Sequence, residues 1–598
     1  MKAGPAEAVR DPQRLLLLAF ALLILLYPFL LPSDYALGVG ITVGAMAIAT
    51  VGFVLLIGYA HQLAIGQAAF CTIGGYGNAI LVTRHGWDPL GALVASAILS
   101  MAVAYIVGRP ILRLRGFVLA MASVALQLIL GFVAVQWTDF TGGSIGIAGV
   151  PRFGILGRVM GDRELFYVIW LCVFLAVLLG LSIDRSRVGR ELRAIAASER
   201  GAESVGIDLA AVKVRMFVLS AGLASIAGSL TVHYLRLMEP SVFGFSFSLT
   251  IINAVVIGGL SSIWGGVLGA ATIIGLREAL RLAAQPLFEG VVMSVLTIVV
   301  LLLFPQGIAG GIAALRRRLG RTATAERAMA PVAALPVPAA GPVDTTSDPI
   351  LIVDGAVRRF GNLIAVDDVG FAVERGSITA LIGPNGAGKT TLFNMISGDQ
   401  PLDAGRVVFN GEAIDRLPGH IVARRGIART FQNLELFENL TVLENVMCAS
   451  ALRGAAGVIE VIARLPRGRR AERAARADAE RQLELVGLGA GRDHHPGALP
   501  FGHQRLLEIA RALALKPKLL LLDEPASGLN DSETEALGDL VLRIRHAGVT
   551  VLLVEHDIRL VMGLADHVVV VNYGKKIADG APGMVRNDPQ VLAAYLGT

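Results

Sequence analysis

A glycine-rich stretch carries the clearest chemistry in this 598-residue chain. Its residues are Gly383, Pro384, Asn385, Gly386, Ala387, Gly388, Lys389, Thr390 and Thr391. They fit the pattern G-x-x-x-x-G-K-[ST], in which backbone N–H groups of the loop surround phosphate groups. In such a loop the lysine reaches the β- and γ-phosphates, and the hydroxyl that follows, here Thr390, binds Mg²⁺. The stretch therefore predicts a site for a nucleoside triphosphate.

The elements that must position this loop agree with the prediction. Residues 378–382 form a short apolar run, which indicates a buried strand, and residues 391–396 have helical character. A loop between a strand and a helix N-terminus is an anion site, because the helix dipole places partial positive charge there. The alternative is a glycine-rich turn with a Lys-Thr pair by chance, and it leaves both flanks unexplained.

Two carboxylates follow a second apolar run. The run 519–522 consists of leucines and is typical of a parallel strand buried on both faces. It is followed by Asp523 and Glu524. Downstream of a phosphate-binding loop, Asp523 is predicted to organise Mg²⁺ and its waters, and Glu524 to activate the attacking water as general base. An ordinary helix N-cap is the alternative interpretation of the two acids.

Composition divides the chain into a membrane half and an α/β half. Hydrophobic residues make up 54% of the chain and charged residues 17%, and the apolar runs lie before residue 305. From residue 350 onward strands and helices alternate, as in an α/β domain. The 3 cysteines have no spacing typical of a disulfide framework or a metal site. A formal charge of +6 is weak evidence for nucleic acid, since arginines that flank membrane spans account for much of it, and no nucleic-acid partner is expected.

The membrane half is predicted to contain about ten spanning helices. A span needs about 20 mostly apolar residues, and the candidate runs are 14–31, 37–58, 66–82, 89–108, 116–136, 165–183, 216–235, 247–275 and 288–304. Basic clusters at 109–115 and 185–215 should be cytoplasmic. The run 247–275 is interrupted by glycines, and dividing it into two short helices keeps residue 305 on the cytoplasmic side, where ATP is available. Glycine-interrupted helices are also typical of transporter cores.

Two connecting segments complete the domain prediction. In the loop 184–215, residues 188–205 indicate a short amphipathic helix, with a solvated positive-inside loop as the alternative. Residues 316–349 begin with three arginines and continue with Ala, Thr and Pro, as in an extended linker. We therefore expect a transmembrane domain over 1–315, a linker over 316–349 and an α/β domain over 350–598.

Taken together, these motifs resemble the ATPase domain of ABC transporters along residues 350–598. The resemblance implies a P-loop fold with a helical subdomain, and ATP with Mg²⁺ as cofactors. Phe360 lies where the family stacks adenine on an aromatic ring. Gln432 matches the loop glutamine that meets Mg²⁺ and the membrane partner. His556 matches the switch histidine that contacts the γ-phosphate, although a histidine just after a strand is more often a satisfied core residue.

The signature sequence of this family, LSGGQ, departs from its usual form here. It corresponds to residues 499–504, where Gly502 is implied to bind nucleotide across a dimer of ATPase domains. Pro500 replaces the signature serine, Phe501 replaces the first glycine, and Asn530 replaces an aspartate of the following loop. These departures put the contact between the serine and the γ-phosphate in doubt.

A finer resemblance connects both halves to the branched-chain amino acid uptake branch of ABC importers. The similar stretches are 426–432, 440–446 and 593–597 in the ATPase half, and 58–63, 112–116, 141–143 and 258–265 in the permease half. The resemblance implies a permease fused to its ATPase, with the loop 184–215 as coupling helix. It also implies a multi-pass protein of the bacterial inner membrane with a cytoplasmic ATPase domain. The implied partners are a solute-binding protein outside, a second permease and ATPase, and the small-molecule substrate.

The predicted function is ATP-driven import of branched-chain or similar hydrophobic amino acids. Uptake of urea or an amide is an alternative, and so is export, although exporters of this type usually have six long helices that extend into the cytoplasm. A membrane-tethered regulatory ATPase is the third alternative. Asn78, Gln127 and Asn253 within apolar runs favour transport, since polar groups in lipid are costly unless they face a cavity. The sequence names neither the solute nor the identity of the second permease and ATPase.

Overall fold

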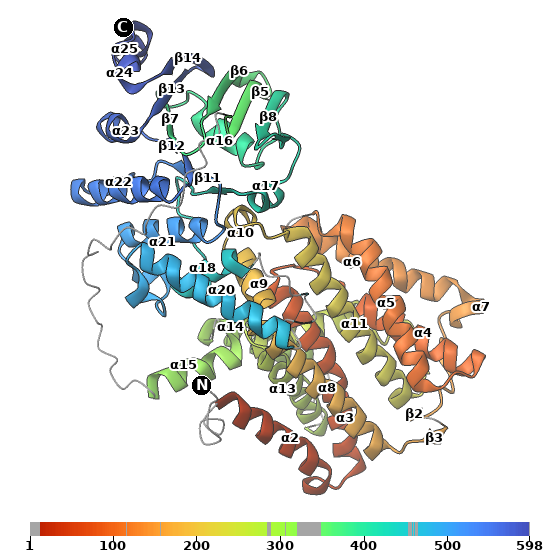
Figure 1. The fold of residues 1–598 in the computed structure, drawn as a ribbon. Helices are drawn as coiled ribbons and strands as arrows, with labels where there is room; N and C mark the ends of the chain where they lie inside the picture. The colour runs from red at the N-terminus through yellow and green to blue at the C-terminus, as the bar shows by residue number, and fades with distance from the viewer. Residues whose placement is uncertain are drawn as a thin grey trace. The chain divides into compact units, whose positions relative to one another are not determined.

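A computed structural model describes residues 12–114, 116–155, 157–283, 289–304, 306–319, 348–451, 457, 460 and 465–596. The chain forms two compact units (Figure 1). The first contains Met1–Arg185 and Ala210–Ala325, and the second contains Ser186–Leu209 and Glu326–Thr598. Of the predicted linker, residues 316–319 form the end of helix α15 (Gly307–Leu319), and residues 320–347 lie outside the described residues.

The first unit is helical. Its long helices are α2 (Pro12–Leu30), α3 (Asp34–Phe53), α4 (Ala68–His85), α5 (Pro89–Ile111), α6 (Gly116–Gln136), α8 (Asp162–Asp184), α11 (Leu209–Leu235), α12 (Phe245–Gly258), α13 (Ile263–Leu282) and α14 (Glu289–Leu303). Within the described residues, 7 helices are long and apolar enough to cross a membrane, and two shorter apolar helices accompany them. The predicted count of about ten spans is therefore loose. The division of the run 247–275 is confirmed, because α12 ends at Gly258 and α13 begins at Ile263.

Helix α3 is the central helix of this unit. It packs against α8, α12 and α13, and nearly every residue from Gly40 onward is buried. A helix that is apolar all round is suited to such a position. It continues into a π-helical turn (Val54–Tyr59), after which the chain runs without helix until α4. Short strand pairs connect the helix ends: β1 (Ile147–Ala148) with β4 (Leu237–Met238), and β2 (Gly154–Ile155) with β3 (Arg158–Val159).

The second unit is built around two sheets. The larger has the order β10-β11-β12-β7-β13-β14 and is parallel except for the β13–β14 pair. Its strands are β7 (Ile378–Ile382), β10 (Ile427–Arg429), β11 (Leu519–Asp523), β12 (Thr550–Val554), β13 (His567–Asn572) and β14 (Lys575–Gly580). The smaller is antiparallel, in the order β6 (Leu363–Val373), β5 (Leu351–Phe360), β8 (Ala404–Phe409) and β9 (Glu412–Ala413). The predicted buried strands at 378–382 and 519–522 are confirmed.

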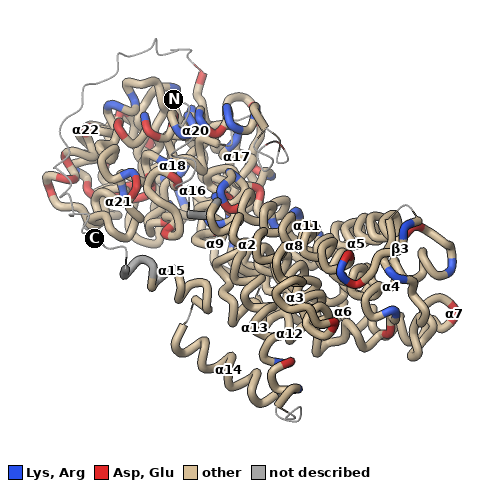
Figure 2. Tube along the Cα trace, turned by 90° about the horizontal axis from the view of Figure 1, so that it is seen from below, with Lys and Arg blue, Asp and Glu red and all other residues tan. Residues whose placement is uncertain are grey.

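Helices cover these sheets and form a helical subdomain. They are α16 (Lys389–Ile396), α17 (Gly419–Arg425), α18 (Val442–Ser450), α20 (Pro466–Leu485), α21 (Phe501–Leu513), α22 (Asp531–His546), α23 (Ile558–Leu564), α24 (Pro582–Val585) and α25 (Pro589–Leu596). In the subdomain α18 packs against α20 and α21. Charged residues are frequent along α20 and α22 and sparse along the long apolar helices of the first unit (Figure 2).

The predicted helix over 188–205 is two helices. They are α9 (Arg187–Ala197) and α10 (Glu199–Ser204), and both belong to the second unit. The interruption occurs at Ser198, whose backbone is extended and whose Oγ accepts a hydrogen bond from Gly201 N at 2.8 Å. A serine N-cap starts a new helix because it satisfies a backbone N–H that would otherwise have no partner.

Candidate functional site

The glycine-rich loop lies between β7 and α16, as predicted. Gly383, Gly386 and Gly388 have φ of 152°, 82° and 99°, values that favour glycine. A Cβ atom at Gly383 would lie 2.0 Å from the carbonyl oxygen of Val571, so a larger residue cannot replace it without movement. Lys389 begins α16, and Thr390 and Thr391 follow it. The N-terminus of α16 therefore points into the concave side of the loop, where phosphate groups would bind.

Lys389 lies folded over the loop. Its Nζ donates to the carbonyl oxygens of Gly383 at 2.7 Å and Pro384 at 3.0 Å. Burial lowers the pKa of Lys389, and the charges of Glu524 and Asp523 oppose this shift. Phosphate oxygens would be better partners than carbonyl groups for this ammonium, because charge-assisted hydrogen bonds are the stronger ones.

The three predicted catalytic side chains meet at one carboxylate. Gln432 Nε2 donates to Glu524 Oε2 at 2.9 Å, and His556 Nε2 donates to Glu524 Oε1 at 2.8 Å. Glu524 has a φ of 48°, which is rare for a residue with a side chain and is typical of functional positions. Residues 92 and 32 positions away in the sequence therefore hold the two oxygens of the proposed general base.

Asp523 is held from one side by a buried arginine. Arg429 Nη2 donates to Asp523 Oδ2 at 2.9 Å, whereas Asp523 Oδ1 is buried and has no hydrogen-bond partner among the described residues. Burial raises the pKa of Asp523, and the Arg429 guanidinium opposes this shift. The Asp523 oxygen without a partner, the Thr390 hydroxyl and the Gln432 amide oxygen are ligands of the kind that Mg²⁺ prefers. The sequence alone indicates no role for Arg429, because only the sheet order β10-β11 brings it beside Asp523.

The remaining predicted nucleotide contacts lie at the ends of β5 and α21. Phe360 is the last residue of β5 and is 43% exposed, with the Arg358 guanidinium 4.9 Å from its ring centroid. Gly502 lies in the first turn of α21, where a Cβ atom would be 2.7 Å from Glu533 Oε1. An exposed aromatic ring fits adenine stacking, and a bare helix N-terminus fits phosphate binding.

The unusual signature residues lie at helix starts, and Phe501 is 46% exposed. Pro500 is the N-cap of α21, and the Phe501 ring lies against Gly528, where a Cβ atom would be 2.9 Å from the ring. Asn530 caps α22 by accepting a hydrogen bond from Glu533 N at 2.9 Å. Asparagine and aspartate are about equally good N-caps, so the Asn530 departure preserves the start of the helix.

A buried Arg–Glu–Arg cluster on α21 holds the segment that contains Gln432. Arg505, Glu508 and Arg511 are 1%, 0% and 1% exposed. Arg505 donates to the carbonyl oxygens of Phe431 and Gln432 at 2.6 and 2.9 Å, and Arg511 donates to that of Glu435 at 2.6 Å. Burial raises the pKa of Glu508, and the two guanidinium groups oppose this shift. Partial charges on the carbonyl groups therefore help to compensate two buried cations.

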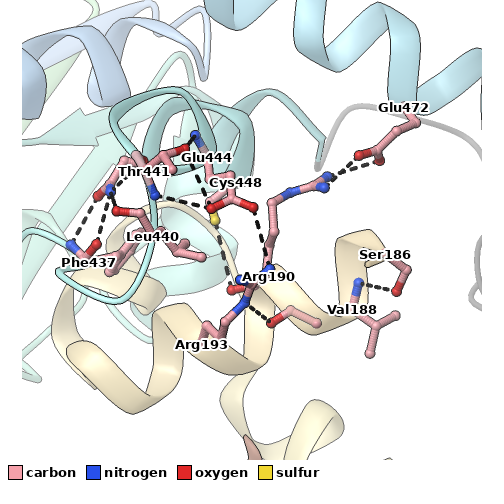
Figure 3. A network of polar contacts seen from close by, with 12 residues as sticks. Ser186, Val188, Arg190, Arg193, Phe437, Leu440, Thr441, Glu444, Cys448 and Glu472 are labelled. Atoms are coloured by element: carbon pink, nitrogen blue, oxygen red, sulfur yellow. Dashed lines mark hydrogen bonds and ion pairs between the residues drawn. The ribbon is translucent and has the colours of Figure 1, made fainter. Parts of the chain in front are cut away.

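The helices α9 and α10 contact the rest of the second unit through polar groups (Figure 3). Arg190 forms two hydrogen bonds with the Glu472 carboxylate of α20, at 2.5 and 2.9 Å. Burial lowers the pKa of Arg190, but the hydrogen bonds and charge of Glu472 outweigh this effect and raise it. Ser198 Oγ donates to Glu435 at 2.6 Å, three residues from Gln432. These contacts favour a coupling role over a solvated loop.

In the first unit, the turn after α3 contacts the break between α12 and α13, and the contact is made at a glycine. A Cβ atom at Gly58, in the π-helical turn, would lie 1.9 Å from the carbonyl oxygen of Leu260, between α12 and α13. Gln67, at the end of the non-helical stretch, donates to Ser220 O at 2.9 Å, and its own Oε1 is buried without a partner among the described residues. Such breaks are typical of helices that surround a transport pathway.

Comparison with known proteins identifies both halves. Residues 366–527 match the family model of ABC transporters. Residues 35–301 match the permease component of the branched-chain amino acid transport system, and residues 575–598 match the model described as branched-chain amino acid ATP-binding cassette transporter.

Curated relatives match the ATPase half. The chain is 45% identical over 252 residues to the high-affinity branched-chain amino acid transport ATP-binding protein BraF of Pseudomonas aeruginosa, which covers 42% of this chain and 99% of that protein. It is 42% identical over 252 residues to LivG of Escherichia coli, with the same coverage. A solved nucleotide-free ATP-binding cassette from an ABC transporter is 32% identical, with a TM-score of 0.38, and covers 42% of this chain and 100% of that one.

These matches first define a class: the chain is a membrane protein that joins a permease to a cytoplasmic, ATP-hydrolysing ABC cassette. More narrowly, the chain belongs to the branched-chain amino acid ABC transporter family. The resemblance inferred from its motifs is thereby confirmed.

Proposed function

We propose that this chain imports branched-chain or similar hydrophobic amino acids across the bacterial inner membrane, with Mg-ATP hydrolysis as the energy source. The observation that carries the proposal is that the permease half and the ATPase half match components of the same transport system. A solute-binding protein delivers the solute, and a second permease and ATPase complete the complex. Urea or amide uptake is the nearest alternative, since it would use the same architecture.

The ATPase residues divide the chemical work. The backbone of the loop from Gly383 to Thr391 binds the phosphates, together with the side chain of Lys389. Phe360 stacks on adenine. When bound, Mg²⁺ neutralises phosphate charge, and Thr390, Asp523 and Gln432 would hold it. Glu524 accepts the proton of the attacking water, and His556 orients this carboxylate and contacts the γ-phosphate. Gly502 of one ATPase domain completes the nucleotide site of the other.

The coupling route follows hydrogen bonds of the second unit. Glu524 contacts Gln432, and the backbone of the Gln432 segment is held by Arg505 and Arg511. Glu435 of the same segment accepts the Ser198 hydroxyl, at the junction of α9 and α10. A change in the contacts of Gln432 when ATP is hydrolysed would therefore displace the loop between α8 and α11.

Uptake by the complete complex tests this proposal. The chain, with its native partner subunits and solute-binding protein, is reconstituted in proteoliposomes that contain ATP, and uptake of labelled leucine, isoleucine, valine and urea is measured. We expect ATP-dependent uptake of the three amino acids. Uptake of urea alone, or efflux, would refute the assigned function.

A variant pair tests the coupling route in the same vesicles. Ser198→Ala removes the hydroxyl that contacts Glu435, and Ser204→Ala removes a hydroxyl that donates within α10. We expect Ser198→Ala to lower leucine uptake per ATP hydrolysed while ATP binding persists, and Ser204→Ala to leave the ratio unchanged. If Ser198→Ala leaves leucine uptake per ATP hydrolysed unchanged, the loop is a positive-inside connection without a coupling role.

A further inference from the structure

The end of the β5–β6 hairpin lies beside the phosphate-binding loop. Phe360, the last residue of β5, is paired with Leu363 of β6. Two residues farther along β6, the carbonyl oxygen of Ala365 would be 2.4 Å from a Cβ atom added to Gly388 of the loop. A strand rises about 3.3 Å per residue, so Leu363 lies roughly 7 Å from this contact. Phe360 is therefore near enough for the base of a loop-bound nucleotide to reach its ring.

An arginine covers one side of the Phe360 ring. Arg358 lies two positions earlier on β5, so both side chains project from the same face of the strand. The guanidinium carbon of Arg358 is 4.9 Å from the centroid of the ring, within the range of a cation–π interaction. The Phe360 side chain is nevertheless 43% exposed, which leaves space for a second stacking partner.

A carboxylate holds this arginine in place. Arg358 Nη1 donates to Asp403 Oδ1 at 3.0 Å, and the backbone N–H of Arg359 donates to Asp403 Oδ2 at 2.6 Å. The backbone N–H of Asp403 donates in turn to the carbonyl oxygen of Val357 at 2.9 Å. These hydrogen bonds attach Asp403 to β5, and the Arg358 side chain is only 17% exposed. The guanidinium therefore has one well-defined position against the ring.

The sheet order places this arginine and the phosphate-binding loop on opposite sides of β5. Strand β5 lies between β6 and β8 (Figure 1). Asp403 directly precedes β8, which begins at Ala404, whereas the loop contacts β6 at Ala365. Asp403 therefore holds the Arg358 guanidinium toward the β8 side of the ring, and the side nearer β6 remains for the base.

We propose that Arg358 is a positioning residue of the ATP site, which holds the Phe360 ring from behind and is itself held by Asp403. The ring then presents its free face to adenine before the nucleotide binds. A side chain that is already oriented loses less conformational freedom on binding, so nucleotide affinity increases. This inference rests on the proposed function, because it takes Phe360 as the residue that stacks on adenine.

The test measures ATP hydrolysis by the complete complex, with its native partner subunits, in proteoliposomes. Ribose triphosphate, which lacks the base, is the second probe, and its inhibition constant reports phosphate binding alone. We expect Arg358→Ala to raise the KM for ATP about 2- to 5-fold, as for loss of an exposed cation–π contact. The kcat and the inhibition constant of ribose triphosphate should not change. A merely structural defect would instead lower kcat or weaken both ligands alike.

Three further variants sharpen the test. Arg359→Ala is the matched control, because this neighbouring arginine is exposed and contacts Asp403 through its backbone, and it should keep the KM for ATP. Asp403→Asn removes the charge that holds Arg358 and should raise this KM by a smaller factor. In the double variant Phe360→Ala/Arg358→Ala, the loss of the arginine should add nothing to the effect of Phe360→Ala, because Arg358 acts only through the ring.

The outcomes separate the role of Arg358 from the stacking assignment. If Phe360→Ala keeps the KM for ATP, the stacking assignment fails, and the role of Arg358 fails with it. If Phe360→Ala raises this KM and Arg358→Ala does not, the role of Arg358 is overturned and the stacking assignment stands.

Two other results would also overturn the role of Arg358. One is an equal effect of Arg358→Ala on ATP and on ribose triphosphate, and the other is a full effect of Arg358→Ala in the Phe360→Ala background. If Arg358→Ala does not fold, Asp403→Asn decides the question, since an unchanged KM for ATP in that variant is incompatible with the proposal.

Discussion

The ATP site and the permease interior differ in the kind of polar group that they bury. Around the ATP site, charges are buried in groups: Arg429 with Asp523, and Glu508 between two arginines of α21. In the permease interior, the buried polar residues are mostly neutral, such as Asn78, Gln67 and Ser220, and close contacts are made at glycines.

The difference follows from what each region must do. Charged groups remain near the ATP site because phosphate chemistry needs them, and they are stable in a buried position when partners compensate them. Inside a membrane an ion is far more costly, so contacts there depend on backbone approach and on neutral hydrogen bonds. Substitutions should therefore act through charge in one region and through shape in the other.

The largest effect is expected at the catalytic carboxylate. Glu524→Gln removes the proton acceptor, and ATP hydrolysis by the complex should fall about 10²–10⁴-fold while ATP binding is preserved. Lys389→Ala should abolish turnover through loss of phosphate binding. Steady-state hydrolysis and nucleotide-binding assays distinguish the two variants. Wild-type hydrolysis by Glu524→Gln would show that another residue is the base.

Next in size is the buried charge cluster of α21. Glu508→Gln leaves Arg505 and Arg511 without their carboxylate, and the ATPase domain should lose about 3 kcal/mol of unfolding free energy. Glu480→Gln, in the partly exposed pair with Arg476 at 3.1 Å, is the control and should change it by less than about 1 kcal/mol. Denaturant unfolding of the full chain in detergent measures both. Equal effects would mean that burial does not distinguish these charges.

A smaller effect is expected where shape alone acts in the permease. Gly58→Ala forces the turn away from Leu260 and should destabilise the first unit by about 1–3 kcal/mol, with lower leucine uptake. Gly131→Ala is the matched control, because no atom lies within 4 Å of its added Cβ, and it should be neutral or stabilise α6 by up to about 1 kcal/mol. Thermal unfolding of the detergent-solubilised chain compares them. Similar behaviour of both variants would contradict the close contact at Gly58.

The smallest effect is expected at Pro500. A serine there would restore the family's hydroxyl, but the Phe501 ring already contacts Gly528, and Pro500 occupies the N-cap position of α21 without a side-chain hydrogen bond. The binding free energy of ATP should therefore stay within about 0.5 kcal/mol of its original value, or binding should become weaker. ATP binding to the complex that carries Glu524→Gln, with and without Pro500→Ser, measures this. Clearly tighter binding with the serine would show that the signature loop is not adapted to proline.

The local motifs determined much of this protein without its fold. The loop around Lys389, the strands before Lys389 and Asp523, and the break after Gly258 were all readable, because each depends on neighbouring residues and on side-chain periodicity. Resemblance to a known family then supplied candidate roles for Gln432, His556 and Phe360, which are unremarkable as isolated residues.

Only the tertiary structure decided which distant residues meet. Three hydrogen bonds join positions far apart in the chain. They connect Arg429 with Asp523, Glu508 with the backbone of Phe431 next to Gln432, and Ser198 with Glu435. Periodicity specifies the face that an element buries, whereas packing of the whole chain selects the partner that this face meets.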